Sequence, residues 1–289
     1  MRVLTYTVLP ELAGRTVKYC LRRQFTLTDG MISSLKWRPG AITLNGVPVH
    51  TNAVVQAGDI LAVQVGDVKP GGRFVPVEVP LDILYEDADL LILNKPAGLA
   101  VHGKNEKGDV TLGNALAFRY GPDTLFHPVN RLDKDTSGAM LVAKNGYIHD
   151  RLRRVLHTGE FRREYLAVVV GQPNPPAGVI NAPIGKSGEG WKREVRPDGQ
   201  SAVTEYETVK TWGELSLLRL TLQTGRTHQI RVHMAHLGHP LLGDWLYGAR
   251  DDRIPRHALH ASRVVLCHPV TGRLVDVSAP LPEDLKKLI

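Results

Sequence analysis

One carboxylate has an unusual setting in this sequence: Asp133, in the segment HPVNRLDKDTSGAMLVAKN that spans residues 127–145. It lies in a short polar turn, two residues after Arg131, and Thr136-Ser137-Gly138 and an apolar strand follow it. The hydroxyls and backbone amides of such a turn can hold a carboxylate at the edge of a sheet, where it could act as a nucleophile or a base. A loop aspartate is more often a turn or cap residue, so the local sequence by itself leaves both roles open.

A second group of reactive side chains lies in QTGRTHQIRVH, residues 223–233, and in the residues that follow it. Four histidines fall within twelve residues: His228, His233, His236 and His239. Histidine is a common zinc ligand, which makes a metal-dependent hydrolase one candidate. The His-Glu-x-x-His spacing is missing, however, and no neighbouring cysteine or acidic residue completes an obvious ligand set. We therefore expect no bound metal.

The composition is that of a globular protein with an excess of positive charge. Of the 289 residues, 43% are hydrophobic and 22% are charged, which allows a substantial core. The 36 Lys and Arg against 29 Asp and Glu give a net charge of +7, which is compatible with nucleic-acid binding or with solubility alone. The two distant cysteines, Cys20 and Cys267, predict neither a disulfide framework nor a metal site. No apolar stretch is long enough to cross a bilayer and the N-terminal residues lack a signal-peptide pattern, so we expect a cytoplasmic protein with no membrane partner.

The positive charge is concentrated ahead of an expected domain boundary. Residues 1–66 hold seven basic and three acidic residues, and so carry +4 of the +7 in less than a quarter of the length. Residues 67–80, DVKPGGRFVPVEVP, combine prolines and glycines with no helical pattern, which is typical of a linker. We therefore expect one domain at 1–66 and a second at 81–289.

The first domain is expected to contain two helices, a hairpin and a closing strand. The residue pattern predicts helices over 15–25 and from Asp29 to about Arg38. The dipeptide Asn45-Gly46 between short apolar runs predicts a tight hairpin, and a strand is expected at 60–65. This order, and above all the run LNGVPVHTNAVVQAGDILAVQV, resembles the S4-like RNA-binding domain.

That resemblance implies that basic side chains of the first domain contact RNA. Those expected to do so are Arg15, Lys18, Arg22, Lys36 and Arg38. Contacts to phosphates would add affinity with little sequence information and would make binding depend strongly on salt. The alternative is that the basic face is only the solvated side of two helices.

The second domain has the pattern of consecutive strands with few helices. Apolar or alternating runs predict strands at 83–85, 90–93, 141–143, 165–170, 202–209, 215–222, 264–267 and 274–278. A helical stripe is formed by Ile148, Leu152, Val155 and Leu156. Because strands outnumber helices and often follow one another, we expect an α+β domain with an extended mixed or antiparallel sheet and flanking helices.

The second domain contains three long blocks, VNRLDKDTSG, REYLAVVVG and TGRTHQIRVHMAHLGHPLLGDWLYG, and three supporting blocks, LILNKPAGLAVH, SAVTEYE and LHASRVVLCHPVTG. In sequence and in order, these blocks are similar to those of the RluA/RluD family of pseudouridine synthases. The resemblance covers about residues 81–282. One departure is Asn130, where many members have a histidine before Arg-Leu-Asp, and it concerns how the Asp133 loop is supported.

The resemblance implies a role for each of five residues. Asp133 corresponds to the catalytic aspartate, and Arg231 corresponds to the basic residue that pairs with it. Tyr165 corresponds to the tyrosine that packs against the target base and can help to remove its carbon-5 proton, and Leu259 corresponds to an apolar wall. Arg131 corresponds to the arginine that helps to fill the space left by the flipped nucleotide. Without the resemblance, Tyr165 would be interpreted as a core residue and Arg231 as a surface charge on a strand.

The chemistry of this family suits these residue types. Isomerisation of uridine breaks the bond between ribose and nitrogen 1, rotates the ring and rejoins it through carbon 5, so no redox cofactor or metal is required and we expect no cofactor. An ionised carboxylate is needed to attack the sugar or the base, or to abstract a sugar proton, and the sequence does not choose among these. Glycosidases use two carboxylates, whereas the sequence offers a single candidate, which argues against a glycosidase mechanism.

The substrate that the resemblance implies is RNA, with ribosomal RNA of the large subunit as the first candidate and transfer RNA as the second. An RNA-binding assembly factor that has lost catalysis is an alternative of a different class. We expect the protein to be a monomer.

Overall fold

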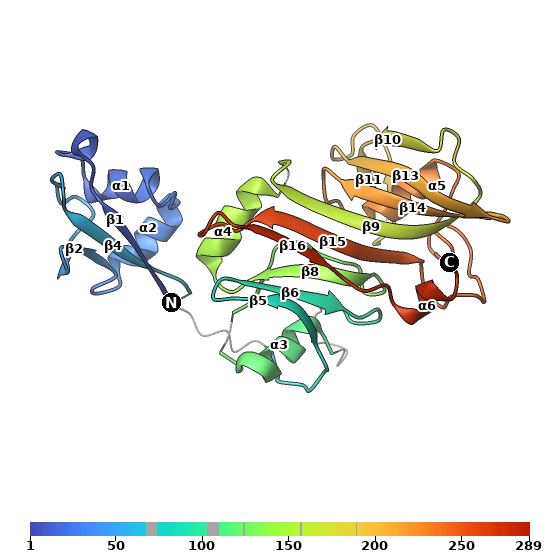
Figure 1. Cartoon of the computed structure of the whole chain (residues 1–289), viewed down its shortest axis with the longest axis horizontal. Coiled ribbons are helices and arrows are strands. Elements are labelled where there is room, and N and C mark those ends of the chain that lie inside the picture. Colours follow the sequence, from blue (N-terminus) through green and yellow to red (C-terminus); the bar gives the residue numbers. More distant parts are fainter. Residues whose placement is uncertain (68–73, 103–109, 124, 157, 189) are drawn as a thin grey trace. The chain divides into compact units, whose positions relative to one another are not determined.

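The computed structural model describes residues 1–67, 74–102, 110–123, 125–156, 158–188 and 190–289 (Figure 1). The chain forms two compact units: Met1–Pro70 with Asn145–Arg151, and Gly71–Lys144 with Leu152–Ile289. Of the segment expected to be a linker, 67–80, residues 68–73 lie outside the described residues.

The N-terminal unit contains a four-stranded antiparallel sheet and two helices. The strands β1 (Arg2–Thr7), β2 (Ile42–Leu44), β3 (Val47–Pro48) and β4 (Ile60–Val65) pair in the order β1-β4-β2-β3. The helices are α1 (Val17–Arg23), α2 (Asp29–Lys36) and the short 3-10 helix η1 (Pro10–Leu12). α1 and α2 begin after Thr16 and Thr28, each of whose hydroxyls accepts a hydrogen bond from a backbone amide three residues later.

Two features of this sheet bear on the sequence analysis. The predicted hairpin is present, and Asn45 and Gly46 have the positive φ angles, 53° and 83°, that its tight turn needs. The strand β1 was not predicted. Its residues alternate between half-buried and exposed, and it pairs along its whole length with β4.

The larger unit is built on one mixed sheet, to which ten strands of the described residues belong. The main path is β10-β13-β14-β9-β15-β8-β6-β5, with β16 paired to β15 and β7 paired to β8. Their bounds are β5 Asp82–Glu86, β6 Leu90–Lys95, β7 His127–Pro128, β8 Ser137–Ala143, β9 Phe161–Val170, β10 Ala177–Asn181, β13 Val203–Trp212, β14 Leu215–Leu222, β15 Leu259–Cys267 and β16 Leu274–Ser278. Neighbours are antiparallel except β15 and β8, which run parallel. The sheet confirms the expected α+β class.

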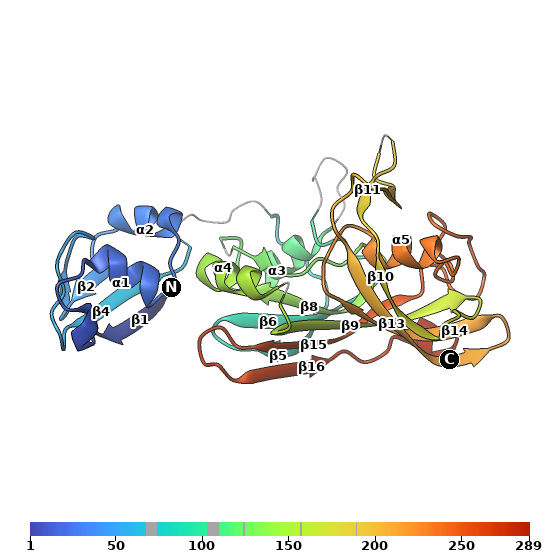
Figure 2. The same cartoon turned by 90° about the horizontal axis from the view of Figure 1, so that it is seen from above.

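Few helices accompany this sheet. They are α3 (Leu112–Tyr120), α5 (Gln229–His236) and α6 (Glu283–Lys286), and a separate ladder joins β11 (Ile184–Lys186) to β12 (Arg193–Val195). The helix α4 (Gly146–Val155) is divided between the two units, because Asn145–Arg151 belongs to the N-terminal one. With the sheet seen on edge, α3 and α5 lie on the same face of it (Figure 2). No helix of the described residues is both long enough and apolar enough to span a bilayer.

The strand β8 is central to the larger unit, and all of its residues are buried. It pairs with β15 at two positions, Ser137 with His260 and Gly138 with Ala261. Gly138 has a φ of 113°, and a Cβ at this position would lie 2.2 Å from the carbonyl oxygen of Ala261. Only glycine permits this approach, which fixes where the loop before β8 enters the sheet.

Candidate active site

The loop that carries Asp133 connects β7 to β8, and a buried lysine holds its backbone. Lys95 has no exposed surface, and its Nζ donates hydrogen bonds to the carbonyls of Pro96, Leu99 and Lys134 at 2.7, 2.8 and 2.8 Å. Burial lowers the pKa of Lys95 to about 7, while the three carbonyls match the three N–H donors of its ammonium form. The backbone directly after Asp133 is thereby fixed.

Arg256 is a second buried cation that holds the same loop. Its Nη1 donates to the carbonyls of Asp135 at 2.9 Å and Leu259 at 3.0 Å. Its Nε and Nη2 bind both oxygens of Asp284 at 2.7 and 3.1 Å, and a bidentate pair fixes the direction of a guanidinium as well as its position. The loop is therefore tied to α6, which carries Asp284.

Two buried histidines contact hydroxyls at the end of the loop. His257 Nε2 lies 2.8 Å from Thr136 Oγ1, and His260 Nδ1 lies 3.0 Å from Ser137 Oγ. Burial lowers the pKa of each histidine to about 4, so both rings are neutral near pH 7. They act here as neutral hydrogen-bond partners.

Asn130, the departure from the family pattern, supports the neighbouring strand. Its Oδ1 accepts a hydrogen bond from the amide of Leu141 at 2.8 Å, and the side chain is buried. The carboxamide therefore holds the backbone of β8 from within the loop that precedes it.

Arg231, on α5, lies between two carboxylates. Its Nη1 donates to Asp133 Oδ2 at 3.2 Å, while its Nε and Nη2 donate to the two oxygens of Asp244 at 2.7 and 2.8 Å. Asp244 has no exposed surface, and burial by itself would raise its pKa; the hydrogen bonds and the charge of Arg231 outweigh burial and lower it. Asp244 thus fixes the guanidinium in the direction that presents its remaining nitrogen to Asp133.

The five residues that the family resemblance singled out line one small cavity of about 50 Å³: Arg131, Asp133, Tyr165, Arg231 and Leu259. Tyr165 on β9 and Leu259 at the start of β15 are 4% and 5% exposed, and these two strands are paired. Burial raises the pKa of Tyr165, so its phenol is protonated at neutral pH. Tyr165 also belongs to the main apolar core, so packing and a site wall are compatible roles for it.

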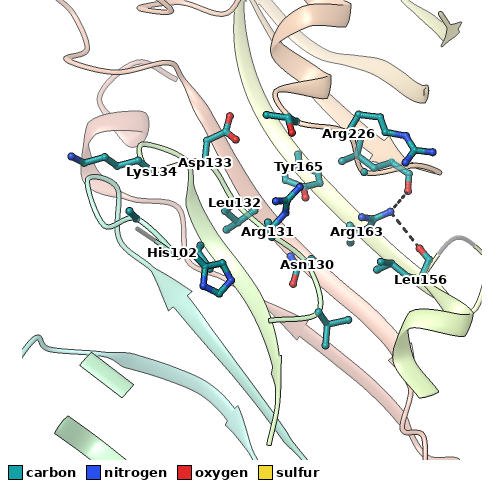
Figure 3. Close-up of a pocket in the computed structure, with 16 residues that line it drawn as sticks. His102, Asn130, Arg131, Leu132, Asp133, Lys134, Leu156, Arg163, Tyr165 and Arg226 are labelled. Carbon is teal, nitrogen blue, oxygen red and sulfur yellow. Dashed lines mark hydrogen bonds between the residues drawn. The ribbon is translucent and has the colours of Figure 1, made fainter. Parts of the chain in front are cut away.

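A larger cavity of about 390 Å³ adjoins the small one. The two share Arg131, Asp133, Tyr165 and Arg226 among their lining residues. Figure 3 shows Asp133 on one side of this cavity, with Arg163 and Arg226 across from it beyond Tyr165. Asp133 therefore lies where a small cavity meets a larger one.

Asp244 and His228 belong to the site although the sequence analysis assigned them no role. His228 precedes α5 with a positive φ of 57°; its Nε2 lies 4.0 Å from Asp133 Oδ2, and its Nδ1 lies 2.8 Å from Tyr247 Oη. Burial lowers the pKa of His228. Asp244 and Tyr247 both fall in the block GDWLYG, which is part of a longer block that matches the family. Their polar side chains within that block were the sequence feature that could have identified them as part of the site.

The four histidines of residues 228–239 do not converge on one point. His233 contacts Thr204 Oγ1 and the carbonyl of Ala182, whereas His239 contacts the carbonyl of Val170. Among the described residues, the group of metal-ligand types that lies close together is a different one: Asp87, Asp89 and His268.

That other group is poorly suited to a metal ion. His268 Nδ1 accepts backbone hydrogen bonds from the amides of Val270 and Thr271, both at 3.1 Å. The proton of the neutral ring is therefore on Nε2, the atom 3.1 Å from Asp87 Oδ2. Nε2 makes no hydrogen bond within the described residues, and because it carries the ring proton it has no lone pair to offer a cation.

The basic residues predicted to contact RNA are divided between two places on the N-terminal unit. They are Arg15, Lys18, Arg22, Lys36 and Arg38. Arg22 and Lys18 both pair with Asp29, which neutralises part of the charge of α1. Lys36 and Arg38, at the end of α2, line a cavity of about 140 Å³.

This chain is similar to several proteins named as RNA pseudouridine synthases. Residues 89–236 match the family described as RNA pseudouridylate synthase. Ribosomal large subunit pseudouridine synthase D of Vibrio cholerae is 39% identical over 307 residues, with 99% of this chain and 93% of that protein covered. The protein of the same name from Escherichia coli is 36% identical, with 98% and 87% covered. An uncharacterized RNA pseudouridine synthase of Bacillus subtilis, YjbO, is 39% identical, with 91% and 94% covered.

Solved structures agree with these sequence relatives. Human RNA pseudouridylate synthase domain containing 1 superposes with a TM-score of 0.59 at 28% identity, covering 70% of this chain and 84% of that one. Human RNA pseudouridylate synthase domain containing 4 gives a TM-score of 0.58 at 26% identity, covering 71% and 90%.

The fold and these relatives define an isomerase that acts on RNA: the chain belongs to the RNA pseudouridine synthase family and is an RNA pseudouridine synthase. Within that family it is of the RluD type. The alternatives of a metal-dependent hydrolase and of an assembly factor without catalysis gain no support from the comparisons.

Proposed function

We propose that this enzyme converts uridines of large-subunit ribosomal RNA into pseudouridine, with Asp133 as the catalytic carboxylate. The observation that carries the proposal is the 3.2 Å contact between Asp133 and Arg231 at a cavity walled by Tyr165 and Leu259. The names of the relatives from Vibrio cholerae and Escherichia coli support the large ribosomal subunit as the source of the substrate.

Asp133 has one oxygen held and one oxygen available. Arg231 binds Oδ2, and among the described residues no hydrogen bond reaches Oδ1. The guanidinium pairs with Oδ2, and the Asp133 side chain, which is 26% exposed, lines the cavity. Oδ1 is therefore the atom that we assign to the reaction, whether it attacks the sugar or the base or removes a sugar proton.

The remaining walls suit a uracil that has left its stack. Extruding a base costs on the order of a few kcal/mol, and contact with an aromatic side chain offsets part of that cost. Tyr165 and Leu259 supply such walls, and the phenol of Tyr165, which burial keeps protonated, can donate a hydrogen bond to the base. Arg131 is exposed at the cavity, where its planar guanidinium can stack in the position that the base vacates.

Release of tritium from carbon-5-labelled uridine tests the assignment of Asp133. The substrate is an unmodified transcript of large-subunit ribosomal RNA, with transfer RNA transcripts assayed in parallel. We expect wild-type protein to release label from the ribosomal transcript and Asp133→Asn to release none, because Asn cannot supply the anionic oxygen. The control Asp252→Asn alters an exposed aspartate outside both cavities and is expected to react as wild type.

Each outcome of this assay bears on a separate part of the proposal. Undiminished release by Asp133→Asn would refute the role of the carboxylate. Release confined to transfer RNA would leave that role intact and contradict the ribosomal substrate.

We also propose that the N-terminal unit is an S4-like domain that binds RNA. Its two basic helices, its Asn-Gly hairpin and the cavity lined by Lys36 and Arg38 support this. Because Lys18 and Arg22 are paired with Asp29, we expect Lys36 and Arg38 to give the larger effect. The double variant Lys36→Gln, Arg38→Gln of the full chain should weaken RNA binding and lower its salt dependence. Binding equal to wild type at every salt concentration would contradict this role.

A further inference from the structure

The larger cavity beside Asp133 is lined by several positively charged side chains. Three arginines line it: Arg131, Arg163 and Arg226. Among the described residues the single carboxylate that lines it is Asp133, which already binds Arg231 at 3.2 Å. None of the three lining arginines forms an ion pair with a carboxylate of the described part of the chain. The cavity is therefore a place where positive charge lacks a counter-ion.

Arg163 is the most buried of these arginines, with 4% of its surface exposed. Its Nη2 donates long hydrogen bonds to the carbonyls of Leu156, Leu222 and Thr224 at 3.4, 3.2 and 3.4 Å. Figure 3 draws the bond to Leu156. Its Nε has no partner among the described residues. A buried cation without a counter-ion is costly, so an anion bound in the cavity that Arg163 lines would offset its charge.

Gly225 keeps the space beside Arg163 open. Gly225 lines the same cavity, and a Cβ at this position would lie 2.9 Å from Arg163 Nη1. The side chain of any other residue at position 225 would clash with the guanidinium of Arg163. The absence of a side chain lets the guanidinium occupy this part of the wall, as close approach of a ligand requires.

Arg163 lies close to Tyr165, which lines the small cavity proposed to receive the target base. It lies two residues from Tyr165 on β9, so the two side chains project from the same face of the strand. Two residues of a strand span about 6.6 Å. Tyr165 is a wall of the small cavity, so Arg163 is placed to meet the RNA strand beside the target nucleotide and not the target base itself.

We propose that Arg163, with Arg226 in the wall of the same cavity, binds a backbone phosphate of the RNA next to the nucleotide being isomerised. A phosphodiester fits this site because guanidinium groups bind phosphate through paired, charge-assisted hydrogen bonds. Such a contact fixes the position of the strand without reading its sequence. The inference rests on the proposed function, because it takes Asp133 as the position of the target nucleotide.

The test is the salt dependence of RNA binding, measured on the full-length protein with Asp133→Asn in every variant so that no turnover occurs. The probe is the unmodified transcript of large-subunit ribosomal RNA, after wild-type protein has been shown to form pseudouridine in it. Arg163→Gln is compared with the matched control Arg162→Gln, on the same strand. Arg162 points to the other face, its side chain is 57% exposed, and it pairs with Glu164 at 3.0 Å.

Loss of a phosphate contact has a signature that loss of a structural contact lacks. We expect Arg163→Gln to weaken binding about tenfold or more, as for a charge-assisted hydrogen bond, and to lower the slope of log K against log salt by about 0.7. We expect Arg162→Gln to change neither quantity. A folded Arg163→Gln protein whose slope equals that of Arg162→Gln overturns the inference.

Two other results are possible, a misfolded Arg163→Gln protein and a wild-type protein that is inactive on the transcript. If Arg163→Gln does not unfold cooperatively, Arg226→Gln carries the test, because within the described residues the Arg226 guanidinium makes a single hydrogen bond, to the carbonyl of Ser201 at 2.9 Å. An unchanged slope in that variant overturns the inference. If wild-type protein forms no pseudouridine in the transcript, the proposed function fails first and the phosphate site falls with it.

Discussion

Replacing Asp244 with asparagine removes the charge that orients Arg231 and keeps the size of the side chain. In the wild-type protein Asp244 has no exposed surface and receives hydrogen bonds from Arg231 at 2.7 and 2.8 Å. Removing one partner of a buried ion pair costs about 3–5 kcal/mol. Asn retains one acceptor oxygen, so we expect the free energy of unfolding to fall by about 3 kcal/mol, at the lower end of that range.

The expected effect on catalysis follows from geometry. With Asp244 neutral, the guanidinium of Arg231 is no longer held in the direction that presents Nη1 to Asp133. A displacement of about 1 Å in such a group costs on the order of 100-fold in rate. Asp244 does not line the small cavity, so we expect kcat to fall by about that factor while KM changes little.

Single-turnover tritium release and chemical denaturation measure the two effects separately. The control is Asp251→Asn, which removes an aspartate paired with Arg253 at the surface, at 2.7 Å. Surface pairs contribute about 0–1 kcal/mol, so the control should keep both its stability and its rate. A folded Asp244→Asn protein with wild-type kcat would refute the orienting role, even if its stability were reduced.

Three further predictions concern the supports of the Asp133 loop and the strand that follows it. Burial lowers the pKa of His257 and His260 to about 4 in the folded protein, whereas a histidine of the unfolded chain has a pKa of about 6.5. Between these two values the unfolded chain binds more protons than the folded protein, so the free energy of unfolding is retained at pH 7 and falls as the pH is lowered toward 4. Denaturation should show about 2 kcal/mol lost per histidine at pH 5, and a wild-type stability no more pH-dependent than that of the double His→Gln variant would contradict it. Lys95→Met leaves three carbonyls without their donor and should lower the free energy of unfolding by about 3 kcal/mol or more, whereas unchanged denaturation would show that the ammonium is dispensable. Gly138→Ala should destabilise the fold by more than about 3 kcal/mol in thermal melts, while Gly159→Ala, with nothing within 4 Å, should stay within about 0.5 kcal/mol; equal melting temperatures would count against the close β8–β15 approach.

The catalytic candidates were predictable because they lie in blocks of sequence that match a family. Asp133 and Arg231 are 98 residues apart in the chain, and spacing alone gives no reason for them to meet. Their supports were not predictable in the same way. Asp244 and Arg256 act through contacts between loops that converge only after the sheet has formed, and hydrophobic periodicity carries no record of such contacts.

The helix α5 was not predicted from the sequence. The alternative interpretation of Arg231 as a surface charge on a strand does not hold, because Arg231 lies on this helix and is 5% exposed. Gln229 and His233 on the same helix are also buried, so its buried residues are not confined to an apolar stripe. Polar residues buried on a short helix lack the pattern that identifies helices in sequence. The strand β8 began four residues earlier than predicted for a related reason, because Ser137 and Gly138 are buried without being apolar.

Mapping pseudouridines across total RNA tests the central claim most directly. Cells that lack this protein are complemented with wild-type protein, with Asp133→Asn or with Asp252→Asn. We predict that positions in large-subunit ribosomal RNA lose their pseudouridine in the deletion strain and regain it with wild-type protein and with Asp252→Asn. The Asp133→Asn protein, expressed at the same level, should restore none of them. Restoration by Asp133→Asn would contradict the account, because no other group at the cavity has been assigned its chemistry.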